Sequence, residues 1–102
     1  MRKQRREKLE KLVSEVVEEK RLWMLCYSRV KQHVDRIVEL AVKLRVPARK
    51  DCIANFIAAY MVVNGLIPPS VADKTVSSSA RGRRQWQKKL LQLLGTARLA
   101  AP

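Results

Sequence analysis

The sequence contains one histidine, two cysteines and three glycines, and this scarcity limits the chemistry open to the chain. His33 has no nucleophilic Cys or Ser beside it in an obvious catalytic motif. No CxxC pair and no cluster of His and Cys has the spacing of a zinc site. The glycines are isolated, so no glycine-rich phosphate loop is present. We therefore expect no enzyme activity, no metal, no cofactor and no small-molecule substrate.

The sequence also lacks the segments that direct a chain to the secretory pathway or hold it in a membrane. Its basic N-terminus continues into glutamate-rich sequence, where a signal peptide needs an apolar run. Its most apolar stretch is shorter than the roughly 20 residues that span a bilayer. Cys26 and Cys52 lie in apolar stretches, which favours buried free thiols over a disulfide. We therefore expect no membrane span and no disulfide.

Acidic residues are few, because 22 lysines and arginines stand against 9 aspartates and glutamates, for a net charge of +13. In a chain of 102 residues this excess indicates a polyanionic partner, with nucleic acid favoured over an anionic membrane. The apolar fraction of 47% is too high for a disordered basic tail. The length is typical of one domain with a modest core.

The chain is organised around residues 51–64, DCIANFIAAYMVVN, which are apolar on nearly every side of a helix. A helix of this composition belongs in a protein interior, and Asn55 is the one strongly polar residue within it. Asn64 and Gly65 suit a left-handed C-terminal cap, and the prolines at 68–69 prevent the helix from continuing. We therefore predict a buried central helix that ends before Gly65.

Two amphipathic helices precede the central one, the first from about Arg5 to about Leu22 and the second from Ser28 to about Arg45. The small, polar residues after Pro69 are typical of a loop or linker. Beyond them, RRQWQKKLLQLLGTARLA has the pattern of a basic helix that Gly95 caps.

The predicted fold is therefore mainly all-α, with a small three-helix core, a basic N-terminal arm and a C-terminal basic helix. Residues 1–69 are expected to form the core with its arm, and residues 70–102 the linker and the basic helix. Only residues 75–78 have any strand character. The sequence leaves open whether the last helix packs on its own core or on a partner.

Few aromatic residues are available to stack on bases. Trp23 and Tyr27 are expected to be core anchors at the junction of the first two helices, a role favoured over base stacking. Trp86 lies between basic residues in RGRRQWQKK, where stacking on an unpaired base and docking of the last helix are equally compatible with the pattern. For His33, packing or an RNA-facing role is favoured over catalysis.

The basic residues gather at the two ends of the chain, with five in positions 2–8 and seven in positions 74–102. Lys and Arg bind phosphates by releasing condensed counterions, and Arg donates two hydrogen bonds to one phosphate. No signature of a helix-turn-helix, zinc finger or RNA-binding sheet is present, so structured RNA recognised by shape is the predicted ligand. The predicted C-terminal contacts are Arg81, Arg83, Arg84, Lys88 and Lys89.

Residues 5–22, RREKLEKLVSEVVEEKRL, resemble the opening helix of the bacterial-type large-subunit ribosomal protein number seventeen family. SRVK at 28–31 and DRIVELA at 35–41 look similar to segments of that family's second helix. FIAAYMVVNGLIPP resembles its third helix and the following turn more loosely, so the resemblance covers roughly residues 5–68. The family's later Gly-Gly-Tyr-Thr-Arg signature and final strand have no counterpart here. The resemblance is thus to a divergent form, more typical of an organellar ribosome.

This resemblance implies a structural constituent of the large ribosomal subunit, mitochondrial or alternatively cytoplasmic, whose partners are ribosomal RNA and neighbouring ribosomal proteins. It implies an RNA-contacting arm and further contacts near the first helix junction. These residues are Arg2, Lys3, Arg5, Arg6 and Lys8 in the arm, and Arg21, Arg29 and Lys31 at the junction. The residues alone leave two other interpretations open. One is a free-standing double-stranded-RNA-binding protein that dimerises through residues 22–27, and the other is an adaptor whose last helix docks on a protein or an anionic membrane.

Overall fold

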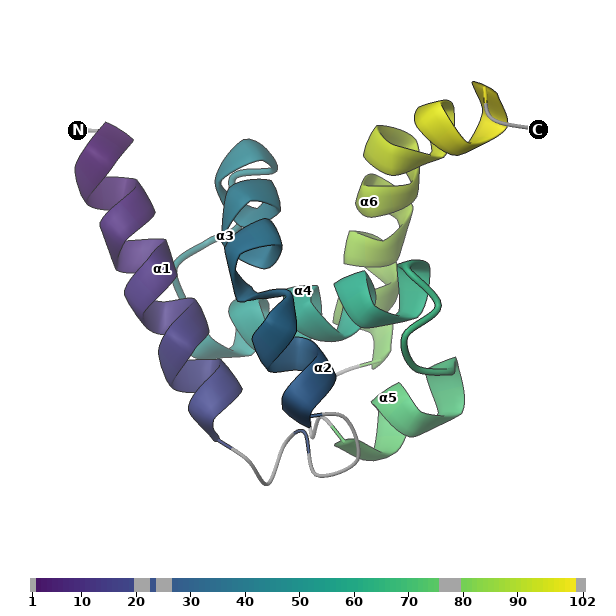
Figure 1. Cartoon of the computed structure of the whole chain (residues 1–102), viewed down its shortest axis with the longest axis horizontal. Coiled ribbons are helices and arrows are strands. Elements are labelled where there is room, and N and C mark those ends of the chain that lie inside the picture. Colours follow the sequence, from purple (N-terminus) through teal and green to yellow (C-terminus); the bar gives the residue numbers. More distant parts are fainter. Residues whose placement is uncertain (1, 20–22, 24–26, 76–79, 101–102) are drawn as a thin grey trace.

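The computed structural model describes residues 2–19, 23, 27–75 and 80–100. Within these ranges the chain forms helices and no strand, so the predicted all-α fold is confirmed (Figure 1). The helices are α1 (Arg2–Glu18), α2 (Tyr27–Gln32), α3 (Val34–Lys43), α4 (Lys50–Val63), α5 (Pro69–Thr75) and α6 (Ala80–Ala100).

Helix α4 is the centre of the molecule, as its apolar sequence predicts. Figure 1 shows α4 crossing the molecule, with the N-terminal part of α1, α3 and the C-terminal half of α6 on one side of it and α2 and α5 on the other. The helix ends where the sequence predicts, since Gly65 adopts a φ of 68° and the Asn64 side-chain amide donates to the Tyr60 carbonyl at 2.9 Å. Its buried residues are Ile53, Ala54, Phe56, Ile57, Ala58, Ala59, Tyr60, Met61 and Val63.

The apolar stripe of α1 packs against α3 and α4. Leu9, Val13, Val16 and Val17, all predicted to form this stripe, are buried. Trp23 is fully buried just beyond α1, and its indole N–H donates to the Val16 carbonyl at 2.9 Å. This bond satisfies the one polar atom of the indole inside the core. Trp23 is therefore the core anchor that the sequence predicts, and it holds the end of α1 in place.

The second predicted helix is divided at His33 into α2 and α3. His33 has a φ of −104° and a ψ of 9°, outside ideal helical geometry, and its N–H donates to the Val30 carbonyl in a tighter turn. Its ring packs on Tyr60 of α4, and His33 Nδ1 shares a hydrogen bond of 2.9 Å with the Tyr60 hydroxyl. The predicted packing role of His33 agrees with this contact. The division of the helix was not predicted, because an apolar stripe at helical spacing continues across it.

Ionisation of the Tyr60 hydroxyl makes the stability of the fold depend on pH in the alkaline range. Burial raises the pKa of Tyr60 above its ordinary value near 10, and the nearby Arg36 guanidinium only partly offsets this shift. The unfolded chain therefore ionises first, so the contribution of Tyr60 is complete below about pH 10 and is lost as the pH rises through the folded-state pKa. We expect Tyr60→Phe to cost about 1 kcal/mol at neutral pH. Denaturant unfolding at about pH 8 and about pH 11 should show that the cost shrinks at the higher pH, and a constant cost would contradict this assignment.

Four predicted boundaries are wrong. Helix α1 ends at Glu18, whereas the sequence predicts an end at about Leu22. Residues 69–75 form helix α5 where a loop was predicted, because Pro69 suits the first position of a helix and the Pro68 carbonyl accepts from the N–H of Val71 and Ala72. Helix α6 continues through Gly95, which therefore is not its cap. Helix α1 begins at Arg2, so residues 2–8 are its first turns and not a separate arm. Residues 76–78 of the suggested strand lie outside the described ranges.

Helix α6 packs on α4, which answers the question that the sequence left open. Leu90 is fully buried in the core, and the Trp86 ring meets Phe56 edge to face with centroids 5.6 Å apart. The two helices approach closely at Gly82, where an added Cβ would lie 2.8 Å from the side-chain amide nitrogen of Asn55. Trp86 is therefore a docking anchor in this structure, and α6 is part of the fold.

Candidate nucleic-acid interface

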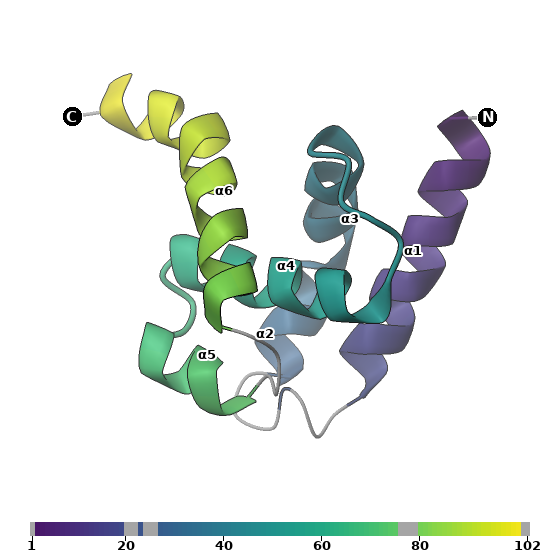
Figure 2. The same ribbon diagram turned by 180° about the vertical axis from the view of Figure 1, so that it is seen from behind.

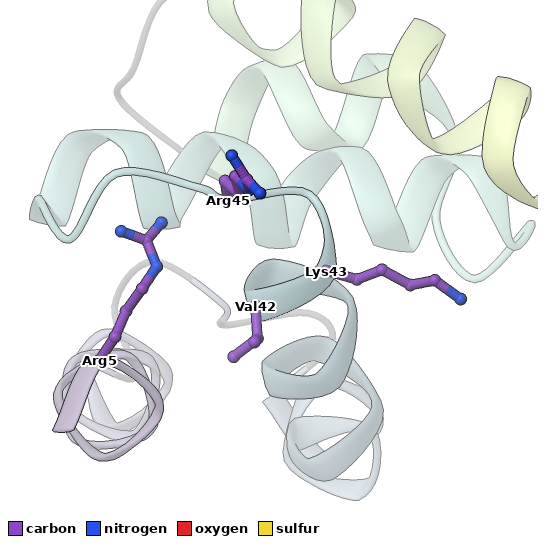
Figure 3. Close-up of a pocket in the computed structure, with 4 residues that line it drawn as sticks. All are labelled: Arg5, Val42, Lys43 and Arg45. Carbon is purple, nitrogen blue, oxygen red and sulfur yellow. The ribbon is translucent and has the colours of Figure 1, made fainter. Parts of the chain in front are cut away.

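Three helices contribute to one side of the molecule. The N-terminal end of α1, the C-terminal end of α3 and the C-terminal half of α6 all lie on the same side of α4 in both views (Figures 1 and 2). Between α1 and the turn after α3 lies a pocket of about 500 Å³, lined by Arg5, Val42, Lys43 and Arg45. Figure 3 shows Arg5 extending from α1 toward this turn and Arg45 on the turn itself, while Lys43 extends away from Arg5. We call this pocket between α1 and the turn after α3 the first pocket.

A second pocket of about 520 Å³ lies between the same turn and α6, lined by Lys43, Leu44, Arg45, Lys89, Gln92 and Leu93. Because Lys43 and Arg45 line both pockets, the two pockets adjoin at the turn after α3. None of the described lining residues is acidic. We call Arg5, Lys43, Arg45 and Lys89, the cations of these two pockets, the basic face.

Helix α6 extends the positive charge away from the basic face. Arg81, Arg84 and Lys88 share one exposed side of the helix at i, i+3 and i+7 spacing, and with Gln85 they line a third pocket of about 410 Å³. Lys89 lies one residue further on, with its ammonium 4.6 Å from the centroid of the Trp86 ring. This cation–π contact holds the Lys89 ammonium over the indole, and Lys89 also lines the second pocket.

Three ion pairs of the described residues lie away from the basic face. Lys50 pairs with Glu19, Arg36 with Glu39, and Arg49 with Asp51, at N–O distances of 3.1–3.2 Å. These cations are already partly neutralised by carboxylates, and none of them lines a described pocket. None of the four cations of the basic face takes part in these three ion pairs, which favours the basic face over Arg36, Arg49 and Lys50 as a surface for a polyanion.

Only some of the N-terminal residues predicted to contact RNA lie at the basic face. Arg5, Arg6 and Lys8 are exposed on α1, but only Arg5 lines a pocket, and its guanidinium donates to the Val46 carbonyl at 3.3 Å. Arg2 and Lys3 belong to the first turn of α1, and their side chains are not described. Arg21 lies outside the described ranges.

Arg29 and Lys31 lie apart from the basic face. Both are on α2, on the opposite side of α4 from the N-terminal end of α1 (Figure 1). The Arg29 guanidinium donates to the Leu66 carbonyl at 2.8 Å, and the Lys31 ammonium lies 5.7 Å from the centroid of the Tyr27 ring. Neither cation lines a pocket of the basic face.

The structure corrects the prediction that Arg83 contacts RNA, because Arg83 is buried with only 6% of its surface exposed. Its guanidinium donates to the Pro69 carbonyl at 3.0 Å, which ties α6 to the start of α5. Positions 83, 86 and 90 recur at i, i+3 and i+7, so Arg83 shares the side of α6 that carries Trp86 and Leu90 into the core. The Arg83 side chain is therefore not available to an RNA phosphate. Arg81, Arg84, Lys88 and Lys89 are exposed, as an RNA contact requires.

The sequence reasoning missed Lys43 and Arg45 as site residues. Both are off the apolar stripe of the second predicted helix, and the segment KLRVPARK at 43–50 carries four basic residues and no acidic one. That local excess was a usable signal. It is smaller than the clusters at the two ends of the chain, and only the fold shows that it lies between Arg5 and Lys89.

Comparison with known proteins finds no matching family model, no matching curated protein and no matching solved structure. The resemblance of residues 5–68 to a ribosomal protein family therefore stays a prediction. Among the helices described, none combines the length and the apolar character needed to cross a membrane. Within the same ranges, no three His, Cys, Asp or Glu side chains gather as metal ligands.

Proposed function

We propose that this protein binds structured RNA through the basic face. The observation that supports the proposal is the pair of adjoining pockets, lined by Arg and Lys from α1, α6 and the turn after α3, with no acidic residue among the described lining. Because these cations stand on packed helices and a hydrogen-bonded turn, phosphate binding orders their side chains and not the backbone, and it releases the counterions condensed on the nucleic acid. A fixed array of cations also selects for the spacing of phosphates, which favours a ligand of defined shape.

Binding to purified ligands tests the proposal directly. The wild-type chain is titrated against a labelled RNA hairpin, a DNA duplex of equal length and vesicles rich in anionic lipid, each at several salt concentrations. If each cation of the basic face contacts one phosphate, the plot of log K against log salt should have a slope of about −3 to −4. Absence of salt-dependent RNA binding would overturn the proposal, and equal binding to the vesicles would favour a membrane surface.

We further propose that the RNA is ribosomal and that the chain is a structural constituent of the large subunit, in the mitochondrial ribosome. This proposal rests on the resemblance of residues 5–22 to the opening helix of the ribosomal family. Sucrose-gradient sedimentation of a native lysate, with and without ribonuclease, tests it. Co-sedimentation with the large subunit should survive a high-salt wash and be lost after ribonuclease. Recovery at the top of the gradient, together with RNA binding in vitro, would identify a free-standing RNA-binding protein.

A further inference from the structure

Helices α3 and α4 end in the same hydrogen-bonded motif with different residues at its key position. At the end of α4, the N–H of Leu66 donates to the Met61 carbonyl at 2.8 Å, and the N–H of Gly65 donates to the Val62 carbonyl at 3.0 Å. This pair of bonds defines a Schellman motif, which places one residue in the left-handed conformation. Gly65 occupies that position with a φ of 68°, as its lack of a Cβ favours.

At the end of α3, the same position is taken by an arginine. The N–H of Val46 donates to the Ala41 carbonyl at 3.0 Å, and the N–H of Arg45 donates to the Val42 carbonyl at 3.2 Å. Arg45 adopts a φ of 56° and is the one non-glycine residue with a positive φ in the described ranges. The left-handed conformation brings a Cβ too close to the following carbonyl, so an arginine here is less stable than a glycine.

The turn that holds Arg45 is fixed on both sides. Val46, the next residue, is fully buried in the core, and its carbonyl accepts from the Arg5 guanidinium at 3.3 Å. Arg45 itself is exposed and lines both the first and the second pocket. A residue kept in a strained conformation at a shared boundary between two basic pockets indicates a functional demand for its side chain.

We propose that Arg45 is the phosphate anchor of the basic face. Its guanidinium donates two hydrogen bonds to one phosphate of an RNA backbone at the point where the strand passes from the first pocket to the second. Arg5 and Lys89 then neutralise the phosphates on either side. This inference rests on the proposed RNA-binding function and adds to it the residue on which binding depends and the path of the bound strand.

Arg45→Gly tests the inference. If the Arg45 side chain had a structural role, the substitution would lower the Tm, whereas a binding role predicts an unchanged or higher Tm together with weaker RNA binding. Glycine relieves the left-handed strain, so the Tm should stay the same or rise by a few degrees, about what a small gain in stability produces. Affinity for the RNA hairpin should fall roughly 5- to 10-fold at about 0.15 M salt, and the salt slope should lose about 1. Arg45→Lys keeps the charge without the forked geometry, so it should keep the slope and lose less affinity.

Gly65→Arg is the matched control, since it places an arginine at the same position of the Schellman motif that ends α4. It should lower the Tm by several degrees and leave RNA affinity within about twofold of wild type. If Arg45→Gly binds the hairpin with wild-type affinity and slope, Arg45 is not the anchor although the chain still binds RNA. If the wild-type chain shows no salt-dependent RNA binding, the proposed function itself fails.

Discussion

Replacing Phe56 by alanine is expected to destabilise the protein by about 3–5 kcal/mol, a large part of the 5–15 kcal/mol that stabilises a typical domain. Phe56 is fully buried on α4 and meets the Trp86 ring of α6 at an interplanar angle of 87°. Its removal leaves a cavity between the central helix and α6, and it deletes an edge-to-face aromatic contact. The loss is large because both helices depend on this contact.

Denaturant unfolding followed by far-ultraviolet circular dichroism measures the effect. Leu91→Ala is the matched control, since Leu91 lies on the same helix as Trp86 with 47% of its surface exposed, and it should cost under about 0.5 kcal/mol. A double-mutant cycle with Phe56→Ala and Trp86→Ala should give a coupling free energy of about 0.5–1.5 kcal/mol. A Phe56→Ala cost below about 1 kcal/mol, with no coupling, would mean that α6 does not dock on α4 in solution.

The docking of α6 also determines the shape of the candidate site. Lys89 reaches the second pocket only because Trp86, on the preceding turn, rests against Phe56. Helix α6 therefore links the core to the basic face, with its apolar side packed on α4 and Lys89 lining the second pocket. We infer that Phe56→Ala also displaces Lys89 from Arg45, so that RNA binding falls along with stability.

Apolar composition was enough to predict the centre of this fold. Residues 51–64 are apolar on nearly every side, and such a segment is stable only when other helices cover it. Burial of the α1 stripe and the end of α4 at Gly65 followed from spacing and cap residues, which are local signals. The split at His33 did not follow from the sequence, because an apolar stripe continues across it and the hydrogen-bond partner of His33, Tyr60, lies 27 residues away.

The sequence predicted that the candidate site binds a polyanion, but it did not predict where on the fold the site lies. An excess of basic residues indicates a polyanion, but charge alone does not show which cations face the same way. Arg83 belongs by sequence to the same cluster as Arg84, yet one is buried against α5 and the other is exposed. Lys43 and Arg45 were not predicted as site residues, because what distinguishes them is their position between α1 and α6 in the fold. Sequence spacing shows which side of a helix a residue occupies. Which other element packs against that side is known only from the fold.

Two triple variants with the same change in charge should differ sharply in RNA binding. The face variant is Lys43→Gln, Arg45→Gln and Lys89→Gln, and the control variant is Lys31→Gln, Arg36→Gln and Lys50→Gln. Each removes two lysines and one arginine, so both lower the net charge of +13 by three. The face variant removes three of the four cations of the two adjoining pockets, whereas the control residues line none of the described pockets.

Affinity of the face variant for the RNA hairpin is expected to fall on the order of 100-fold at about 0.15 M salt, because each lost phosphate contact removes about 0.9 from the salt slope. The control variant loses only long-range attraction, which salt at this concentration screens beyond about 8 Å, so its affinity should fall less than about fivefold. Titration of all three proteins across a salt series gives both the affinities and the slopes. Equal losses in the two variants would mean that net charge alone drives binding and that the basic face has no special role. A larger loss in the control would move the interface to the helices that carry Lys31, Arg36 and Lys50, and it would agree with the RNA contact at Lys31 that the resemblance to the ribosomal family implies.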